Sequence, residues 1–303
     1  MKQKIISILS IAILFLALIN PTIIFAKTNA VKPINEKLGV PIVVYGANLS
    51  AEEKEYVATA LRVNEESEYD EIAISGQDLV KYLKNSNASS RMYSSAKITR
   101  QEEGKGLIIS IVTPDNITQV TSEMYATAML TAGITDAVVE VAAPKPVTGH
   151  SALVGIYKAY EMKTGEVLDV ERTDVANEEL SVATDLASKS GISNEKVAEL
   201  LTQIKKVIAE QKPATKEDVE QIVKEQLEKY GINLSEQDLN ALVELMNRIS
   251  KLDIDFKQLS NQLADLSQKF EEKFGALLQD EGFWASVKNF FTNLIDTIAS
   301  WFK

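Results

Sequence analysis

Short runs of β-branched residues alternate with helical stretches over residues 40–161, and this alternation constrains the fold more than any other feature. The predicted elements, in chain order, are strand 41–45, helix 50–63, strand 69–74, helix 77–84, strands 91–100 and 107–112, helix 121–132, strand 137–142 and helix 149–163. Alternating strands and helices bury the apolar sides of the helices against a shared sheet. We therefore expect residues 40–173 to form an α+β or α/β domain of strand–helix units on a mixed sheet, preceded by a linker at 27–39.

Turn and cap residues add detail to this domain. Ser50 and Glu53 have the spacing of a capping box at a helix start, and Gly133 is a C-cap candidate. The string Gly104-Lys-Gly106 makes a short, glycine-rich connection between two predicted strands. These two strands are therefore expected to pair as a hairpin.

From residue 174 onward the pattern is helical throughout. Gly191, Pro213 and Gly231 are helix breakers at the spacing of a helical hairpin array. Residues 174–234 are therefore predicted to form helical hairpins. The N-cap residues expected at the helix starts are Ser193, Thr215 and Ser235.

A heptad pattern of apolar residues follows. Spacings of three and four residues alternate, which keeps one seam of a helix facing a partner helix. The seam consists of Leu242, Leu245, Ile249, Leu252, Phe256, Leu259, Leu263, Leu266 and Phe270. Residues 235–281 are therefore predicted to form one long helix of the coiled-coil type.

Residues 282–303 have the pattern of an amphipathic helix. At 100° per residue its apolar side chains fall within an arc of about 140°. They are Phe283, Trp284, Val287, Phe290, Phe291, Leu294, Ile295, Ile298, Trp301 and Phe302. The opposite face is polar and almost uncharged. Such a face needs a partner, which is another helix of the chain, a membrane surface, an envelope protein or a second copy.

The amino-terminal residues have the order of a secretory signal peptide. A short basic end precedes an apolar run over residues 5–19, and Ala26 is a small residue suited to cleavage. A membrane-spanning anchor is the alternative, but Pro21 interrupts the run before the about 20 apolar residues that a bilayer requires. Residues 1–26 are predicted to be a signal peptide, and the mature chain is expected to be secreted or associated with the cell surface.

Composition excludes several classes of function. The chain has 32 basic and 43 acidic residues, and the basic residues are spread along acidic helices, so a nucleic-acid partner is not expected. There is no cysteine, which excludes thiol catalysis and cysteine-based zinc sites. His150 is the only histidine, so a histidine-rich metal centre is excluded too. No metal or cofactor site is predicted.

Two motifs match those of acyl-serine enzymes. Ser94-Ser-Ala-Lys97 fits their Ser-x-x-Lys motif, and Lys163-Thr-Gly165 fits their Lys-Thr-Gly motif. That mechanism requires the serine at the start of a helix with the lysine one turn later, whereas residues 92–99 have a strand pattern. The sequence therefore favours a strand with exposed hydroxyl groups at the first motif and a helix end at the second.

His150 and Ser151 could belong to a hydrolase triad. The string Gly-x-Ser-x-Gly is absent around Ser151, so a structural histidine at a helix start is predicted instead.

Several short strings occur in a fixed order along residues 40–235. They are Val44-Tyr-Gly-Ala-Asn-Leu49, Ser94-Ser-Ala-Lys-Ile98, Val112-Thr-Pro-Asp-Asn-Ile117, Thr121-Ser-Glu-Met-Tyr125, Thr131-Ala-Gly-Ile-Thr-Asp-Ala137 and the segment from Ala143 to Gly155. In these strings the chain resembles the YpuA-like family of exported bacterial proteins. The family has no established activity, so the resemblance implies an extracytoplasmic bacterial protein and carries over no catalytic residue.

These features together predict an exported, non-enzymatic binding or structural module at the bacterial cell envelope. The alternative is a secreted hydrolase or acyl-serine-type enzyme that uses residues of the α/β domain. A cleft in which Ser94, Lys97 and a carboxylate converge would favour the enzyme.

Overall fold

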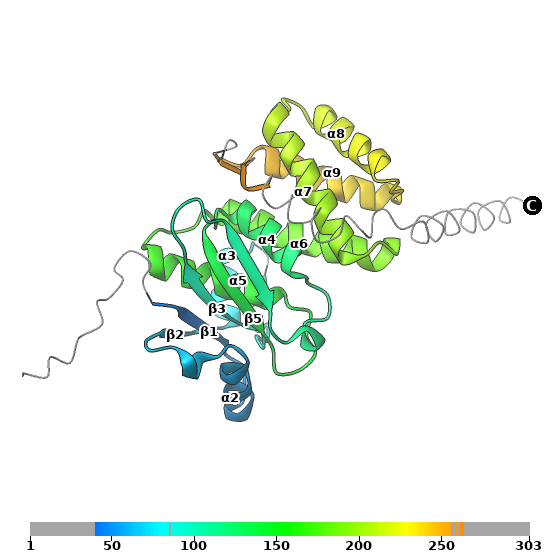
Figure 1. Ribbon diagram of the computed structural model, residues 1–303. Coiled ribbons are helices and arrows are strands. Elements are labelled where there is room, and N and C mark those ends of the chain that lie inside the picture. Colours follow the sequence, from blue (N-terminus) through cyan, green and yellow to red (C-terminus); the bar gives the residue numbers. More distant parts are fainter. Residues whose placement is uncertain (1–39, 85, 256–257, 260, 264–303) are drawn as a thin grey trace, which may run out of the picture. The chain divides into compact units, whose positions relative to one another are not determined.

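The computed structural model describes residues 40–84, 86–255, 258–259 and 261–263 (Figure 1). The first part contains β1 (Ile42–Gly46), α2 (Ala51–Ala60), β2 (Asp70–Ile74), α3 (Gly76–Tyr82), β3 (Ser95–Arg100), β4 (Leu107–Ile111), α4 (Ser122–Ala132), β5 (Ala137–Ala142) and α5 (His150–Thr164). The second part contains α6 (Val170–Ser190), α7 (Asn194–Gln211), α8 (Lys216–Lys229) and α9 (Glu236–Ser250). A sheet domain followed by a helical region was predicted from the sequence, and this fold class is confirmed.

The strands form a five-stranded mixed sheet in the order β2-β1-β3-β5-β4. β1 and β2 are parallel, as are β4 and β5, whereas β3 runs antiparallel to both β1 and β5. The predicted hairpin between β3 and β4 is wrong, because β5 lies between them. β5 is buried at nearly every position, which suits an interior strand, while β4 alternates between half-buried and exposed residues, which suits an edge. The glycine turn after β3 bonds to Asp136, whose carboxylate accepts a hydrogen bond from the Gly106 N–H at 2.7 Å.

Helices cover both faces of this sheet. On one face α5 packs against β1, β2 and β3, and α4 packs against β4 (Figure 1). Gly155 allows the close approach of α5, because a Cβ atom there would lie 3.1 Å from Cγ1 of Val44. On the other face Val57 and Leu61, from α2 and its end, pack with Val43 of β1.

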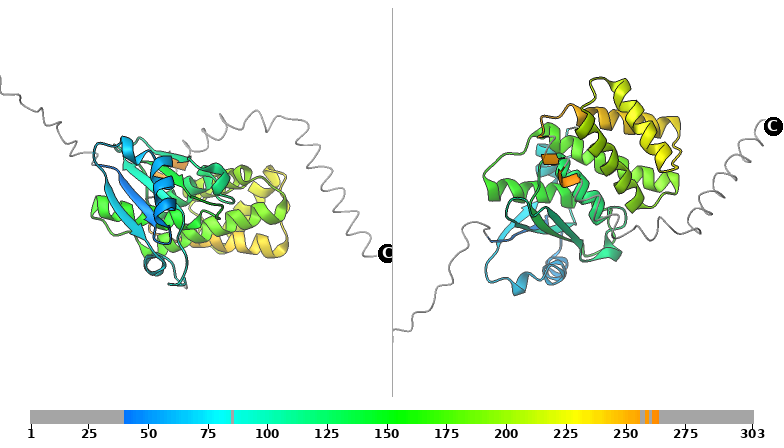
Figure 2. Two further views of the ribbon diagram at one scale, coloured as in Figure 1. Left: turned by 90° about the horizontal axis from the view of Figure 1, so that it is seen from below. Right: turned by 45° about the horizontal axis from the view of Figure 1, so that its top comes forward.

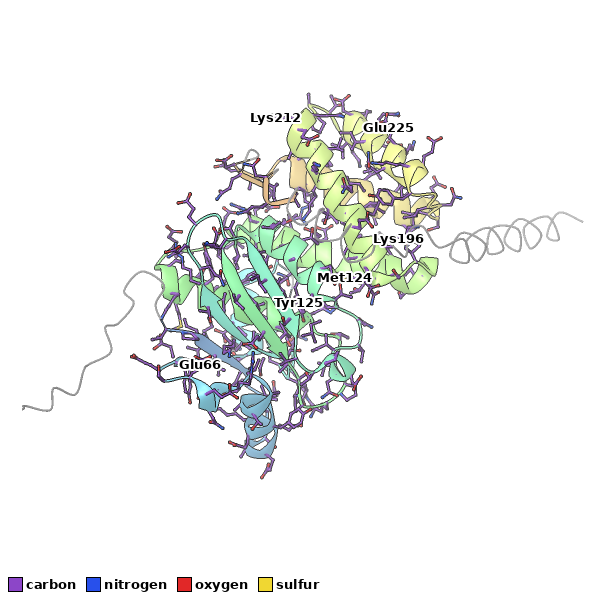
Figure 3. All side chains as sticks on the ribbon, in the orientation of Figure 1. Glu66, Met124, Tyr125, Lys196, Lys212 and Glu225 are labelled. Atoms are coloured by element: carbon purple, nitrogen blue, oxygen red, sulfur yellow. The ribbon has the colours of Figure 1, made fainter. Side chains whose placement is uncertain are left out.

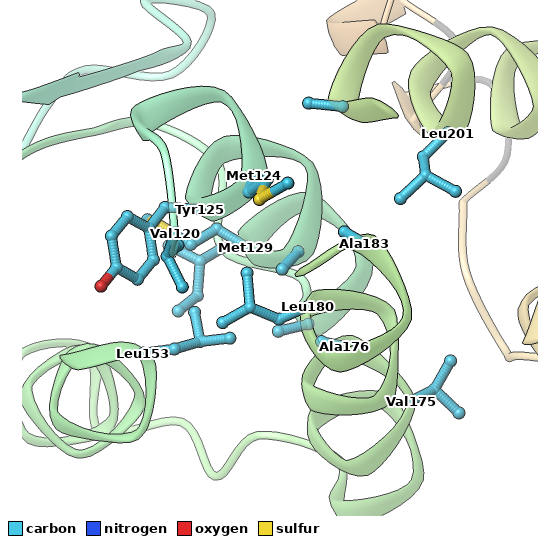
Figure 4. Close-up of a cluster of buried hydrophobic side chains, with 14 of the residues drawn as sticks. Val120, Met124, Tyr125, Met129, Leu153, Val175, Ala176, Leu180, Ala183 and Leu201 are labelled. Atoms are coloured by element: carbon cyan, nitrogen blue, oxygen red, sulfur yellow. The ribbon is translucent and has the colours of Figure 1, made fainter. Parts of the chain in front are cut away.

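The helical region shares one hydrophobic core with the sheet. α4 packs on β4 and also on α6 and α7, and α8 packs against both α7 and α9 (Figure 2). Met124 and Met129 of α4, Leu153 of α5, Leu180 of α6 and Leu201 of α7 belong to the same buried cluster (Figure 4). The predicted boundary at residue 173 therefore falls inside α6, a helix that packs on both parts.

The expected helix caps are confirmed. The side chains of Ser193, Thr215 and Ser235 each accept a hydrogen bond from a backbone N–H three residues later. Ser50 and Glu53 form the expected capping box, and Gly133 ends α4 in the left-handed conformation. Local capping chemistry therefore sets these helix ends.

The prediction of one helix over residues 235–281 is wrong, because α9 ends at Ser250. The N–H groups of Lys251 and Leu252 bond to carbonyls three residues earlier, which tightens the last turn. The Asp255 carboxylate then accepts a hydrogen bond from the Gln258 N–H at 3.1 Å, as an N-cap does. Aspartate bonds readily to nearby backbone groups and so favours caps over helix interiors, which accounts for the interruption.

The predicted seam residues that the structure describes are buried in the core of the protein. They are Leu242, Leu245, Ile249, Leu252, Leu259 and Leu263. The last two pack against Leu130 of α4, so their partner is a helix of the α/β part. Outside the described residues lie Phe256, Leu266 and Phe270, the predicted signal peptide 1–26, the predicted linker 27–39 and the segment 282–303 with its predicted amphipathic pattern.

Candidate functional site

A pocket of about 330 Å³ lies between α3, α5, α6 and the segment that leads into β3. Its lining residues are Leu79, Leu83, Ser90, Arg91, Met92, Tyr93, Ser94, Val147, Thr148, Gly149, His150, Ser151, Asn177 and Ser181. Pockets that hold small ligands in proteins have volumes of roughly 300 to 1,000 Å³. Eight of the fourteen lining residues are Ser, Thr, Asn, His or Arg, so this lining is more polar than that of most small-ligand pockets.

The segment before β3 is held against β1 by close backbone contact. The Met92 N–H donates to the side-chain oxygen of Asn48 at 2.8 Å, and the Asn48 N–H donates to the Met92 carbonyl at 3.1 Å. A Cβ atom on Gly46 would lie only 2.4 Å from that carbonyl oxygen. Glycine at position 46 is therefore required for this wall of the pocket.

The opposite wall, at the start of α5, is fixed by Tyr125. Its buried hydroxyl donates to the Gly149 carbonyl at 2.5 Å. Gly149 has a φ of 101°, a conformation that L residues rarely adopt. The Thr118 N–H donates to the Val147 carbonyl at 2.9 Å, which anchors the loop ahead of the helix.

Ser94 contributes a buried hydroxyl group to the pocket. Its side chain is 1% exposed, and among the described residues its Oγ atom has no hydrogen-bond partner. Side chains alternate between the two faces of a sheet along a strand. Continuing the pattern of β3 back by one residue places Ser94 on the same face as Ala96 and Ile98, and α5 covers that face. The next residue, Ser95, faces the other way and accepts a hydrogen bond from the Gly46 N–H at 3.2 Å.

Lys97 lies on the opposite face of the sheet from Ser94. Its ammonium group donates to the Leu61 carbonyl at 2.8 Å and pairs with Glu66 at 3.0 Å and with Glu140 at 2.7 Å. Glu66 is labelled in Figure 3. The Arg62 guanidinium, 2.5 Å from Glu140, completes this cluster. Residues three apart on a strand point to opposite faces, so Ser94 and Lys97 lack the helical geometry of the acyl-serine mechanism.

The second predicted enzyme motif also lies apart from the pocket. Lys163, in the last turn of α5, pairs with Asp70 at 3.0 Å. Gly165 is the C-cap of α5, as expected. Neither Lys163 nor Gly165 is among the residues that line the pocket.

His150 is the first residue of α5 and lines the pocket. Its Nε2 atom lies 3.5 Å from the Thr184 hydroxyl. Burial lowers the pKa of His150 below its ordinary value, and the nearby Asp185 carboxylate acts in the opposite direction. The imidazole is therefore neutral at pH 7.

The structure thus brings Ser94, His150 and Ser151 to one pocket, although the sequence had linked Ser94 to Lys97. Sequence reasoning missed Arg91 and Asn177, which line the same pocket. The Asn177 side chain is held by the Thr173 carbonyl, to which it donates at 2.7 Å. The strand pattern of residues 92–99 had already argued against joint action of Ser94 and Lys97, and strand alternation places them on opposite faces.

A family model described as "Protein of unknown function (DUF1002)" matches residues 45–266. The chain belongs to this family. It is also 34% identical over 276 residues to "Uncharacterized protein YpuA" of Bacillus subtilis (strain 168), which covers 88% of this chain and 91% of that protein. The resemblance drawn from the sequence motifs is therefore confirmed. No solved structure matches the chain.

All lining residues of the pocket fall within the part of the chain that the family model matches. Within the described residues, no helix combines the length and apolar character needed to cross a bilayer. In the same residues, no three side chains of the histidine or carboxylate type gather as a metal site would require.

Proposed function

We propose that the chain is an exported module of the bacterial cell envelope that binds a small polar ligand in the pocket beside α5 without catalysing a reaction. One observation carries this proposal. Nearly all buried polar atoms in folded proteins have a hydrogen-bond partner. The Ser94 hydroxyl has none among the described residues, and Ser94 is one of the residues that line a pocket large enough for a small molecule. A ligand with a hydrogen-bonding group would satisfy it.

The surroundings of Ser94 support binding over catalysis. A serine nucleophile needs a base that is hydrogen-bonded to it and oriented by a third group. The recorded contact of the His150 imidazole is the Thr184 hydroxyl, and Lys97 lies on the other face of the sheet. No base is therefore oriented toward Ser94 among the described residues.

Export and attachment are supported by the sequence at the two ends of the chain. Residues 1–26 have the pattern of a signal peptide. The apolar face of residues 282–303 suits a membrane surface or an envelope protein, and packing on another helix of the chain and self-association are the competing roles for it. The binding domain would then be held at the envelope by its carboxyl-terminal segment.

Thermal-shift measurements on the mature chain test the binding proposal. The panel comprises amino acids, short carboxylic acids, inorganic phosphate and monosaccharides. We expect at least one compound to raise the melting temperature, and Ser94→Val to remove that effect. Ser110→Val is the matched control, because Ser110 is exposed on the edge strand β4. The absence of any shift across the panel, or equal shifts in the Ser94→Val variant, would refute the proposal.

A further inference from the structure

The amino end of α5 has no side-chain cap. The first N–H groups of a helix have no partner within the helix, and an N-cap side chain normally accepts from one of them. At α5 the N-cap is Gly149, and no side chain takes this role. Side chains do cap α2, α4, α6, α7, α8 and α9.

The local packing prevents a capping residue at position 149. A Cβ atom there would lie 2.8 Å from both the Ile117 side chain and the Tyr125 hydroxyl. The φ of 101° disfavours any other residue as well. The Ala152 N–H donates to the Gly149 carbonyl at 3.1 Å. Among the described residues, the first-turn donors left for another acceptor are therefore the N–H groups of His150 and Ser151, and both residues line the pocket.

Ser94 lines the same pocket and has a hydroxyl group that is unpaired in the described part of the chain, which is an observation independent of the helix end. It is 1% exposed, and its Oγ atom has no partner among the described residues. The Ser94 hydroxyl and the N–H groups of the helix end are hydrogen-bond donors from two different elements, the segment before β3 and α5.

The charges around the pocket favour an anion. The chain has 43 acidic residues, yet none of the lining residues is Asp or Glu. Arg91 is the lining residue that carries a positive charge at pH 7. The Asp185 carboxylate, which acts on His150 electrostatically, is paired with Lys189 at 3.3 Å. The partial positive charge of a helix amino end adds to the effect of Arg91.

We infer that this pocket binds the anionic end of its ligand, a carboxylate or a phosphate group, at the amino end of α5, with the Ser94 hydroxyl and Arg91 as further contacts. This inference rests on the proposed binding function and names the class of ligand. Helix amino ends with free backbone donors commonly bind such groups in proteins.

The test uses acetate, inorganic phosphate and uncharged acetamide as probes of the mature chain. His150 is the only histidine, so its ring resonances in an NMR spectrum report on the pocket alone. We expect acetate or phosphate to shift these resonances with saturation, and acetamide to leave them unchanged. A response to acetate alone assigns a carboxylate, and a response to phosphate alone assigns a phosphate.

Two variants and a control locate the binding site. Arg91→Gln and Ser94→Ala should each weaken binding of the responding anion about tenfold, the effect of losing a hydrogen bond to a charged group. Arg100→Gln is the control, because Arg100 is also exposed but is absent from the pocket lining. Arg91 is a surface residue, so its replacement leaves the fold intact.

The outcomes separate this inference from the proposed function. Equal responses to acetate and acetamide, or unchanged binding in Arg91→Gln, would overturn the anion inference while binding in the pocket stands. Unchanged binding in Ser94→Ala as well would count against both the inference and the proposed function. No response to any of the three probes overturns the anion inference as well. If the panel of small molecules also fails, the proposed function falls with it.

Discussion

Lys205 of α7 and Glu179 of α6 form an ion pair of 2.7 Å in which neither side chain is exposed to solvent. The ammonium group also donates to the Thr127 carbonyl at 2.7 Å and to the Thr131 hydroxyl at 3.1 Å. Both threonines belong to α4, and their hydroxyl groups donate to Glu179. This network joins the helical region to the helix that packs on the sheet.

Breaking this pair should destabilise the protein strongly. Lys205→Met leaves the Glu179 carboxylate buried without its counterion, which costs about 3 to 5 kcal/mol in comparable cases. The double variant Lys205→Met, Glu179→Leu should recover most of this loss, because it removes both charges. Urea denaturation measures the free energy of unfolding of each protein. A single variant within about 1 kcal/mol of the wild type would contradict the expectation.

Leu259→Asp should cost about 3 kcal/mol or more of the free energy of unfolding. Leu259 is 5% exposed and packs on Leu130 of α4, so a carboxylate there would lose water without gaining a partner. Gln258→Asp is the control, since Gln258 is exposed and lies one residue away. An unchanged thermal transition in the Leu259→Asp variant would show that this contact does not stabilise the fold.

The ionisation of His150 should make stability depend on pH below neutrality. Burial lowers its folded-state pKa, so the unfolded chain binds the proton more readily, and stability must fall as pH drops below about 6.5. One group changes the free energy of unfolding by at most about 1.4 kcal/mol per pH unit. The fold lowers the pKa values of Glu140 and Glu161 below their ordinary value of 4.5. These two carboxylates therefore change the stability at lower pH than His150 does.

Denaturation of the wild type and of His150→Gln between pH 5 and pH 7 measures this contribution. The variant should lose the slope in this range. An NMR titration of the single histidine should give a pKa below 6.5. A pKa at or above that value would mean that the imidazole is not desolvated.

The strands and helices could be predicted largely from local pattern, because β-branched runs and cap residues act over a few neighbours. The order of the strands in the sheet could not be predicted from local pattern. The turn at residues 104–106 suggested a hairpin, but the burial of β5 on both faces places that strand between β3 and β4. The length of α9 depended on Asp255, whose capping bond competes with a continuous helix.

The pocket was less predictable, because tertiary packing creates it. Ser94 and His150 were both singled out in the sequence, but each with a different partner. They share a pocket because α5 packs across β1 and β3, with Gly155 in close contact with Val44. No pattern in either local segment contains this contact.

Cleavage should leave a mature chain that begins at Lys27. The basic end, the apolar run and Ala26 fit the requirements of signal peptidase substrates. Intact-mass measurement of exported material gives the first residue, and a start at Val31 would place the cut at Ala30 instead. Recovery of the uncut chain in the membrane would support the anchor interpretation.

Residues 282–303 should attach the mature chain to membranes. The apolar face predicted for this segment contains Trp284 and Trp301, the two tryptophans of the chain, and an amphipathic helix of this kind lies with its apolar face in the headgroup region. The polar face carries only Lys288 and Asp296 before the terminal Lys303, so attraction to anionic lipid adds little. Binding should therefore be nearly independent of salt, unlike that of a basic helix.

Co-sedimentation with neutral liposomes measures this attachment. We expect the mature chain to sediment at low and at high salt, deletion of residues 282–303 to abolish sedimentation, and tryptophan emission to shift to the blue on mixing. Because both tryptophans lie in this segment, their emission reports on it directly. Unchanged emission, with equal recovery of the full and truncated chains, would eliminate the membrane as the partner and leave helix packing or self-association as the role of this face.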